Sequence, residues 1–413
     1  MSMSRTDLQL LLLQMLSVAE PVDLQRLIAF GAADWLVIQD MVRDHRIAPM
    51  LQWQKQQRGD AWPIPDYVAV NWLGAYRRAA LRVLRIEQTI FRVSELLDGA
   101  GIPYAALKGA ALAWSVYPNP GIRTMRDLDI LVARDDARRA YDVLHAADFR
   151  TPEMFKNTPE YTLEHDKHFP PLFSPVFEIN VELHFRLTNH IIAGTETADY
   201  HHPERLLAHR TTEMIRDRVI SVLCPTDTLL HIIVHAAYDH GFANGPLVLN
   251  DIALLVANRP IDWPRFWSMA AQGGWIRGCQ LMFQLVEEAH GGLPEPALNA
   301  ATNTLPEAIK HQAKLLTLCK MDEQQEARIV AFLQRPQSVR ERIMYLAARV
   351  FAPRHLVASW GNVERDSIQL IWLYPLRVLY LIRAAVKALL TARTVENADQ
   401  AVVVADWLHT AQD

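Results

Sequence analysis

Two aspartates separated by one residue open an apolar run near the middle of the chain, in the segment 126–132 (RDLDILV). Side chains two residues apart on a β-strand point to the same face, so we expect Asp127 and Asp129 to project together. Paired carboxylates bind a hard divalent cation such as Mg²⁺ or Mn²⁺, and such a cation assists phosphoryl-type transfer. The pair therefore predicts a catalytic metal site.

A third carboxylate is expected from a later strand. The segment 177–185 (FEINVELHF) alternates apolar and polar residues, which is typical of a half-buried strand and places Glu182 and His184 on one face. Glu182 is the predicted third metal ligand and catalytic residue, with Asp166 in reserve. His168 and His184 lie close to this predicted sheet. Each is a candidate to act as a general base, to orient a carboxylate or to contact the bound nucleotide, although a structural histidine has the same pattern.

Phosphate-binding residues are predicted upstream of the aspartates. Lys108 and Gly109 stand where a short extended run, 102–107, gives way to a helical segment, 110–116. The first N–H groups of a helix are available to phosphate, and glycine lets the backbone come close. Arg123, in the loop that leads to the aspartates, is a candidate for the outer phosphates. Arg126 either contacts the nucleotide or balances the acidic cluster.

These segments resemble a known family. The stretch 107–132 (LKGAALAWSVYPNPGIRTMRDLDILV), followed by 181–185 (VELHF), is similar to the uncharacterised nucleotidyltransferase family of the DNA polymerase β-type superfamily. The resemblance implies a minimal nucleotidyltransferase domain with metal on Asp127, Asp129 and Glu182, and nucleotide contacts from Lys108, Gly109 and Arg123. The ordered set of residues predicts that the nucleoside monophosphate of an NTP is transferred to a hydroxyl or phosphate of a small molecule or peptide.

The surrounding elements predict an α+β protein with three parts. Residues 1–98 carry apolar positions at helical spacing, 99–224 alternate strands and helices, and 225–413 are helical again. We therefore expect an N-terminal helical region, a central nucleotidyltransferase domain with a small mixed sheet, and a C-terminal helical domain. The active site is expected in a cleft between the sheet and the helices.

Composition narrows the partners and the compartment. The net charge of −4 argues against a large non-specific nucleic-acid surface, although a local basic groove stays open. Three widely spaced cysteines form neither a disulfide framework nor a metal pattern, which favours a reducing, cytoplasmic setting. The segment 368–390 is apolar and basic with an internal proline. It is a poor bilayer span and is expected either to pack in a helical bundle or to contact a membrane peripherally.

Three other functions remain open from the sequence. The same metal site could transfer a γ-phosphate to a peptide or small molecule, it could modify the 3′ end of RNA as a toxin-like enzyme, or the chain could be a non-catalytic nucleotide-binding or scaffold protein. In the helical part, His231 and His235 are four residues apart and Asp251 follows in the next helix. A metal pair there is disfavoured, and His235 with Asp251 is expected to form a polar pair between packed helices.

Overall fold

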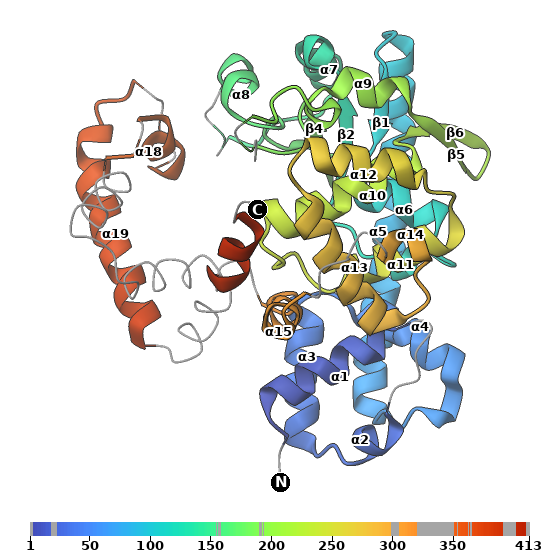
Figure 1. Cartoon of the computed structure of the whole chain (residues 1–413). Coiled ribbons are helices and arrows are strands. Elements are labelled where there is room, and N and C mark those ends of the chain that lie inside the picture. The colour runs from blue at the N-terminus through green and yellow to red at the C-terminus, as the bar shows by residue number, and fades with distance from the viewer. Residues whose placement is uncertain are drawn as a thin grey trace.

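The structure is a computed structural model, and it describes most of the chain. The described residues are 3–17, 23–153, 155, 158–189, 192, 194–298, 305–319, 351–352, 354–361, 363, 366–390 and 402–409. Figure 1 shows the N-terminal helices at one end, the sheet at the other and the C-terminal helices α10 to α15 alongside both.

A six-stranded mixed sheet forms the centre of the α+β fold. Its strands are β1 (Tyr104–Ala106), β2 (Asp127–Val132), β3 (Leu172–Ser174), β4 (Ile179–His184), β5 (Thr211–Ile215) and β6 (Arg218–Val222), in the order β3-β4-β2-β1-β6-β5. β2 runs parallel to β4 and antiparallel to β1, while β1 runs parallel to β6. The α+β architecture expected from the sequence is confirmed.

The two faces of β2 lie against different cores. Leu128, Ile130 and Val132 belong to a core that the sheet shares with neighbouring helices, whereas Leu131 belongs to the core of the N- and C-terminal helices. The helices that follow or flank the sheet are α5 (Asp66–Gly99), α6 (Lys108–Ser115), α7 (Arg134–Ala146), α8 (Pro159–His165) and α9 (Pro203–Ala208). Asp129 and Leu131 are two residues apart on the strand, so their side chains point to the same face. Asp129 therefore faces the side of the sheet toward the N- and C-terminal helices.

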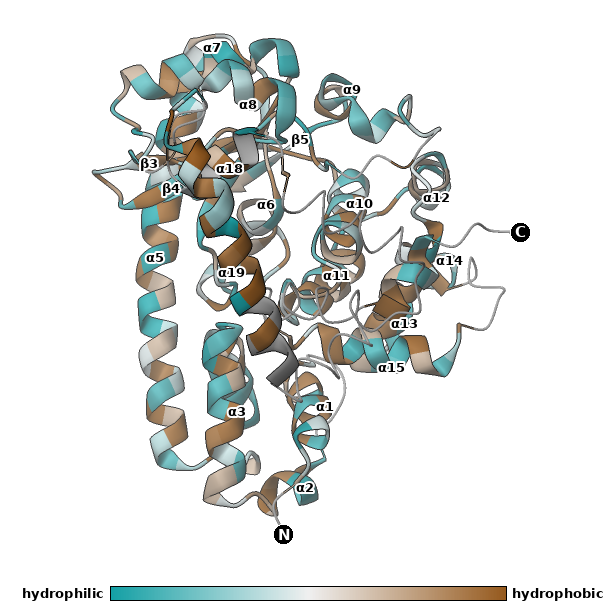
Figure 2. Ribbon diagram, turned by 90° about the vertical axis from the view of Figure 1, so that its left-hand side faces the viewer, coloured by the Kyte–Doolittle hydropathy of each residue, from teal (hydrophilic) through white to brown (hydrophobic). Residues whose placement is uncertain are grey.

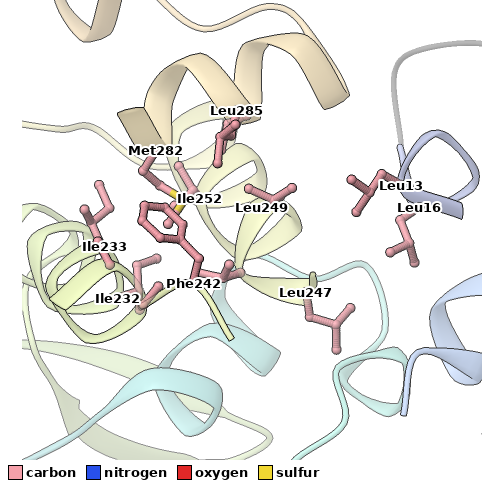
Figure 3. Packing of buried hydrophobic residues seen from close by; sticks show 14 of the residues in the cluster. Leu13, Leu16, Ile232, Ile233, Phe242, Leu247, Leu249, Ile252, Met282 and Leu285 are labelled. Carbon is pink, nitrogen blue, oxygen red and sulfur yellow. The ribbon is translucent and has the colours of Figure 1, made fainter. Parts of the chain in front are cut away.

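The N- and C-terminal helices share one hydrophobic core. The N-terminal helices are α1 (Arg5–Leu16), α2 (Leu24–Ile28), α3 (Ala32–Asp44) and α4 (Ala48–Arg58). The C-terminal helices are α10 (Pro225–Val234), α11 (Leu247–Asn258), α12 (Trp263–Gln272), α13 (Ile276–His290), α14 (Glu295–Leu298) and α15 (Glu307–Leu316). Figure 3 shows Phe242 between Ile233, Ile252 and Met282, with Leu247 on the side toward α1.

Helix α5 connects the N-terminal helices to the sheet. It is 34 residues long, and Figure 2 shows it running from the level of α3 up to β3 and β4. Its N-terminal part contributes Val68 and Trp72 to the shared helical core, and its C-terminal part contributes Ile86 and Ile90 to the core beside the sheet. The division of the chain into residues 1–98, 99–224 and 225–413 stays a prediction.

Two further helices follow near the end of the chain, α18 (Arg354–Gly361) and α19 (Leu370–Leu390). Leu370, Leu373 and Tyr374 of α19 pack with Val357 and Ala358 of α18. Among the described residues, none of the helices combines the length and the apolar character needed to span a membrane. One face of α19, which lies within the segment 368–390, therefore packs against α18. The expected contact of this segment with a membrane surface stays a prediction.

Candidate functional site

The parallel pairing of β2 and β4 brings the predicted acidic residues together. Asp129 stands opposite Glu182 in the register, and Asp127 stands opposite Asn180. Asp129 is buried, whereas Asp127 and Glu182 are partly exposed. Neighbouring strands are about 4.8 Å apart, so opposed side chains on one face lie within reach of a common ion.

Asp129, Glu182 and His184 form the tightest cluster of possible metal ligands. One ligand atom from each of these three residues lies within 4.8 Å of the others. His184 Nε2 is 2.8 Å from Asp129 Oδ1 and 3.6 Å from Glu182 Oε2. The sequence placed His184 on the face of Glu182, but the three metal ligands that it predicted are Asp127, Asp129 and Glu182. Asp127 lines the same pocket and is outside this tightest group.

Lys108 supplies a buried cation to the acidic cluster. Its Nζ donates to Asp129 Oδ1 at 2.9 Å. The residue begins α6 with a φ of 47°, a left-handed conformation that a non-glycine residue adopts only when its surroundings hold it there. Burial acts to lower the pKa of Lys108. The negative charges of Asp129, Glu182 and Asp127 act in the opposite direction and together outweigh burial, so the pKa is raised. The ammonium group therefore stays charged beside the carboxylates.

The three carboxylates differ in their affinity for a proton. Burial, followed by the charges of Asp129 and Glu182, raises the pKa of Asp127 to about 6. Burial also acts to raise the pKa of Asp129, but Lys108 and His184 hold it well below its usual range. Burial acts to raise the pKa of Glu182, but the neighbouring His184 imidazole outweighs burial, so the pKa of Glu182 is lowered. Of the three carboxylates, Asp127 is therefore the one that is protonated most readily.

His168 lies on the open side of Glu182. Its Nδ1 bonds the carbonyl of Phe169 at 2.8 Å, so Nδ1 carries the hydrogen and Nε2 is directed toward Glu182 Oε2 at 3.8 Å. Burial and the neighbouring His184 lower the pKa of His168 to about 4. His168 is thus a neutral imidazole at pH 7, with its unprotonated nitrogen on the side of the acidic cluster.

Gly109 is required by close packing beside α6. A Cβ atom at this position would lie 2.8 Å from Met125 Cγ and 3.1 Å from Met125 Sδ. A distance of 2.8 Å essentially never occurs between real atoms, so a side chain at this position would force Met125, in the loop that carries Arg123, to shift. The predicted nucleotide contact of Gly109 stays a prediction, and the glycine already has a structural reason to be there.

Arg123 forms a buried two-pronged salt bridge. Its Nε and Nη2 donate to the two carboxylate oxygens of Asp251 at 2.8 and 2.7 Å, and Tyr117 Oη donates to Asp251 Oδ1 at 2.6 Å. The sequence paired Asp251 with His235, and that pairing is wrong. His235 instead bonds His240, 3.0 Å between their Nε2 atoms. The expected contact of Arg123 with phosphate stays a prediction, and any such contact must compete with Asp251.

Arg126 is exposed at the mouth of the site. Its backbone carbonyl accepts a hydrogen bond from Arg82, which also donates to the carbonyl of Met125 at 2.9 Å. Burial, followed by Arg126 and Arg82, lowers the pKa of Arg46, so three guanidinium groups approach one another here. This part of the site is positively charged, opposite in sign to the carboxylates.

The site opens into a pocket of about 650 Å³. The central part of the chain contributes Lys108, Gly109, Arg123, Arg126, Asp127, Asp129, Lys167, His168, Glu182 and His184 to the lining. The N-terminal helices contribute Asp44, His45 and Arg46, and the C-terminal helices contribute His235, His240 and Asp251. The nine residues that the sequence predicted to bind the metal or contact the nucleotide therefore line one pocket. Asp166 is not among the described residues that line it.

Lys167 lines the pocket although the sequence did not indicate it, and it is held by Asp239, which is not among the described lining residues. Lys167 Nζ donates to Asp239 Oδ2 at 2.7 Å, and Thr188 donates to the other oxygen of Asp239 at 2.6 Å. Asp239 ends a π-helical turn, His235–Asp239, a rare element that is frequent at functional sites. Neither these residues nor Arg46 belongs to a local motif. Only the packing of distant helices brings them to the sheet.

Comparison with known proteins identifies the family. The family model of uncharacterised nucleotidyltransferases matches residues 31–291, more than half of the chain. No curated protein matches. Among solved structures, the chain is similar to an antigenic nucleotidyltransferase-like protein from Paracoccidioides brasiliensis, with 15% identity, 52% of this chain and 97% of that chain covered, and a TM-score of 0.33. This TM-score is too low to support an argument, so the family assignment rests on the match to the family model alone. The chain belongs to the family of uncharacterised nucleotidyltransferases.

Proposed function

We propose that this chain transfers a nucleoside monophosphate from an NTP to an acceptor hydroxyl or phosphate, in a reaction that requires a divalent metal. The observation that carries the proposal is the convergence of Asp129, Glu182 and His184, with Asp127 and Lys108 in the same pocket. This donor set has the chemistry of a hard-cation site, because it is rich in carboxylate oxygens. Asp127, Asp129 and Glu182 would hold Mg²⁺ or Mn²⁺, and His184 is a further candidate ligand.

A bound divalent cation would supply charge neutralisation at the phosphate oxygens and would help to orient them. The chain's own residues complete this environment. Lys108 places a buried ammonium group beside Asp129, at the first turn of α6 where backbone N–H groups point outward. Arg126, at the mouth, is our candidate for the outer phosphates, together with Arg123.

In the proposed step, an acceptor oxygen attacks the α-phosphorus. The new bond joins that oxygen to the α-phosphorus, and the bond to the bridging oxygen of the β-phosphate breaks, so that pyrophosphate leaves with the bonding electrons. When the acceptor is a hydroxyl, its proton passes to Glu182. This carboxylate is ionised at neutral pH because its pKa is lowered. The neutral His168 offers an unprotonated Nε2 beside this carboxylate, 3.8 Å from Glu182 Oε2.

The test is to identify the released product. Purified protein is incubated with each NTP, Mg²⁺ or Mn²⁺, and a pool of small metabolites and peptides, and pyrophosphate and nucleoside diphosphate are measured separately. We expect metal-dependent release of pyrophosphate, reduced at least about 100-fold in the double variant Asp127→Asn, Asp129→Asn. Release of a nucleoside diphosphate would point instead to a kinase. Full turnover by the double variant would refute the proposed site.

A further inference from the structure

A second pocket of about 610 Å³ lies beside the catalytic pocket and is walled by α3, α4 and α5. Arg46 and Thr124 line both pockets, so the two spaces meet at these residues. Thr124 Oγ1 donates to the backbone carbonyl of Arg46 at 3.1 Å, which fixes the boundary. A ligand in the second pocket would thus have one end close to the acidic cluster.

The second pocket exists because small residues face it. Gly74 and Ala75 lie in the interior of α5, and Ala48 begins α4. Glycine inside a helix costs about 0.5–1 kcal/mol relative to alanine. An added Cβ at Gly74 would meet Arg78 Nη1 at 3.4 Å, so an alanine there requires only a small adjustment of that flexible side chain. The helix thus contains a destabilising residue where a larger one would narrow the pocket.

The charge of the second pocket is positive. Arg43, Arg46 and Arg78 line it, and none of the described lining residues is acidic. Arg43 is neutralised by Asp40 at 2.8 Å. No salt-bridge partner of Arg46 or Arg78 occurs within 4.0 Å in the described part of the chain. All three arginines are exposed, and guanidinium groups gathered around a pocket favour an anion, which they bind through paired N–H donors.

Arg46 is held in an unusual conformation at the junction. Its φ is 55°, in the left-handed region, and it follows α3 directly before α4 begins. A non-glycine residue in this region is strained and is frequent at ligand sites. Its guanidinium approaches those of Arg82 and Arg126, which repel it. An anion placed at the junction would relieve this repulsion.

The remaining wall of the second pocket is apolar. Val42, Pro49 and Val70 line it together with Trp72. Trp72 is 1% exposed, and its Nε1 has no hydrogen-bond partner among the described residues. The pocket therefore combines arginines with apolar surface.

We propose that the second pocket binds the acceptor, and that this acceptor is an organic anion with an apolar body and a phosphate or carboxylate group. The name acceptor rests on the proposed function, whereas the anion binding does not. Arg78 and Arg46 would bind the charged group, and Val42, Val70 and Trp72 would contact the apolar body. The nucleophilic oxygen would then extend past Thr124 toward Asp127.

The probes are 1-naphthyl phosphate, 1-naphthoate and the neutral 1-naphthalenemethanol, measured by calorimetry on the full chain. We expect at least one anion to bind and the neutral compound to bind about tenfold more weakly. The phosphate and carboxylate arms show which group is preferred. Arg78→Met should weaken anion binding about tenfold, whereas Arg77→Met, the exposed neighbour that lines neither pocket, should not.

Two further variants separate this proposal from the proposed catalysis. Gly74→Leu should narrow the pocket and weaken anion binding about tenfold without lowering the melting temperature. The double variant Asp127→Asn, Asp129→Asn should lose metal-dependent NTP binding and still bind the naphthyl anion. The anion site is overturned if neither anion binds the wild-type chain, or if Arg78→Met and Gly74→Leu bind it unchanged. Loss of NTP binding in the Arg78→Met variant would contradict the assignment of this pocket to the acceptor.

Discussion

The carboxylate of Asp127 is the least favourable charge in the site when no metal is bound. Its pKa of about 6 lies above the ordinary value because burial and two carboxylates oppose ionisation. The folded chain therefore holds the Asp127 proton more tightly than the unfolded chain. Stability falls as the pH rises from about 4 to about 6, and the loss is complete above that range.

Asp127→Asn is expected to raise the stability of the metal-free protein at pH 8 by about 2 kcal/mol and to leave it nearly unchanged at pH 4. Asparagine has the shape of the protonated acid and no charge to bury. Denaturation by urea at both pH values, in the presence of a chelator, measures the difference. Glu153→Gln, at an exposed position, is the matched control. An equal effect of Asp127→Asn on stability at both pH values would show that the charge of Asp127 does not destabilise the folded protein.

For single residues, the sequence predicts the strand face on which a side chain lies, because that face depends only on neighbouring positions in the chain. Asp127, Asp129, Glu182 and His184 could be placed on shared strand faces because the two-residue period of a strand is fixed. Arg46 could not be predicted, because only the docking of α3 and α4 against the loop before β2 brings it to the pocket. The partners of a buried charge are decided by packing between distant segments.

The contact between α6 and the loop before β2 depends on a missing side chain. Gly109→Ala would place a Cβ atom 2.8 Å from Met125 Cγ, and overpacking of this kind costs about 1–3 kcal/mol. We expect lower stability and weaker NTP binding, because the loop that carries Arg123 must move. Chemical denaturation and nucleotide titration measure both effects.

The compensating variant tests the cause. Gly109→Ala combined with Met125→Ala should be less destabilised than the sum of the two single variants, because the shortened side chain makes room for the new methyl group. Strict additivity would show that the two residues are not in contact and that the glycine is needed for another reason.

Strands were predictable where an apolar or alternating run is short. The runs 102–107, 126–132 and 177–185 correspond to β1, β2 and β4. β3 and β5 were missed. They are the two edge strands of the sheet, β3 has three residues and β5 is mostly exposed, so neither shows the apolar alternation of an inner strand.

Across the whole molecule, the Arg123–Asp251 pair joins the loop before β2 to α11. Both side chains are buried, and Tyr117 donates a further hydrogen bond to the same carboxylate. Asp251→Ala would leave a guanidinium group buried without its partner, and we expect a loss of about 3–5 kcal/mol in the free energy of unfolding. Thermal and urea denaturation report this loss.

The double variant Arg123→Met, Asp251→Leu separates the two roles of Arg123. Removing both charges should restore much of the stability that Asp251→Ala loses. If Arg123 also contacts phosphate, the stable double variant still binds NTP more weakly than the wild type. A double variant as unstable as Asp251→Ala would mean that the ion pair is not the source of the destabilisation.

Helix α19 exposes an apolar stripe on the face opposite α18. Ile371, Trp372, Leu379 and Ile382 recur at helical spacing and are exposed, as is Ile368 just before the helix. Figure 2 shows the helix, with much of its length coloured as hydrophobic, in front of the body of the molecule. The sequence 370–390 contains three basic residues and no acidic one. Such a helix favours an anionic lipid surface.

We expect the chain to co-sediment with phosphatidylserine-containing vesicles and much less with pure phosphatidylcholine. The double variant Ile371→Glu, Trp372→Glu should abolish this association, whereas Ile28→Glu, an exposed apolar residue of α2, should not. Equal binding to both lipids, or no binding by the wild type, would contradict the prediction that the apolar stripe of α19 binds an anionic lipid surface.

The most direct measurement is a crystal structure of the chain with MnCl₂ and α,β-methylene-ATP, read from the anomalous scattering of manganese. We expect an anomalous peak bounded by the carboxylates of Asp129 and Glu182, with the triphosphate directed toward Lys108 and the start of α6. A nucleotide bound at another place, or manganese absent from these carboxylates while the nucleotide is present, would contradict the proposed catalytic site.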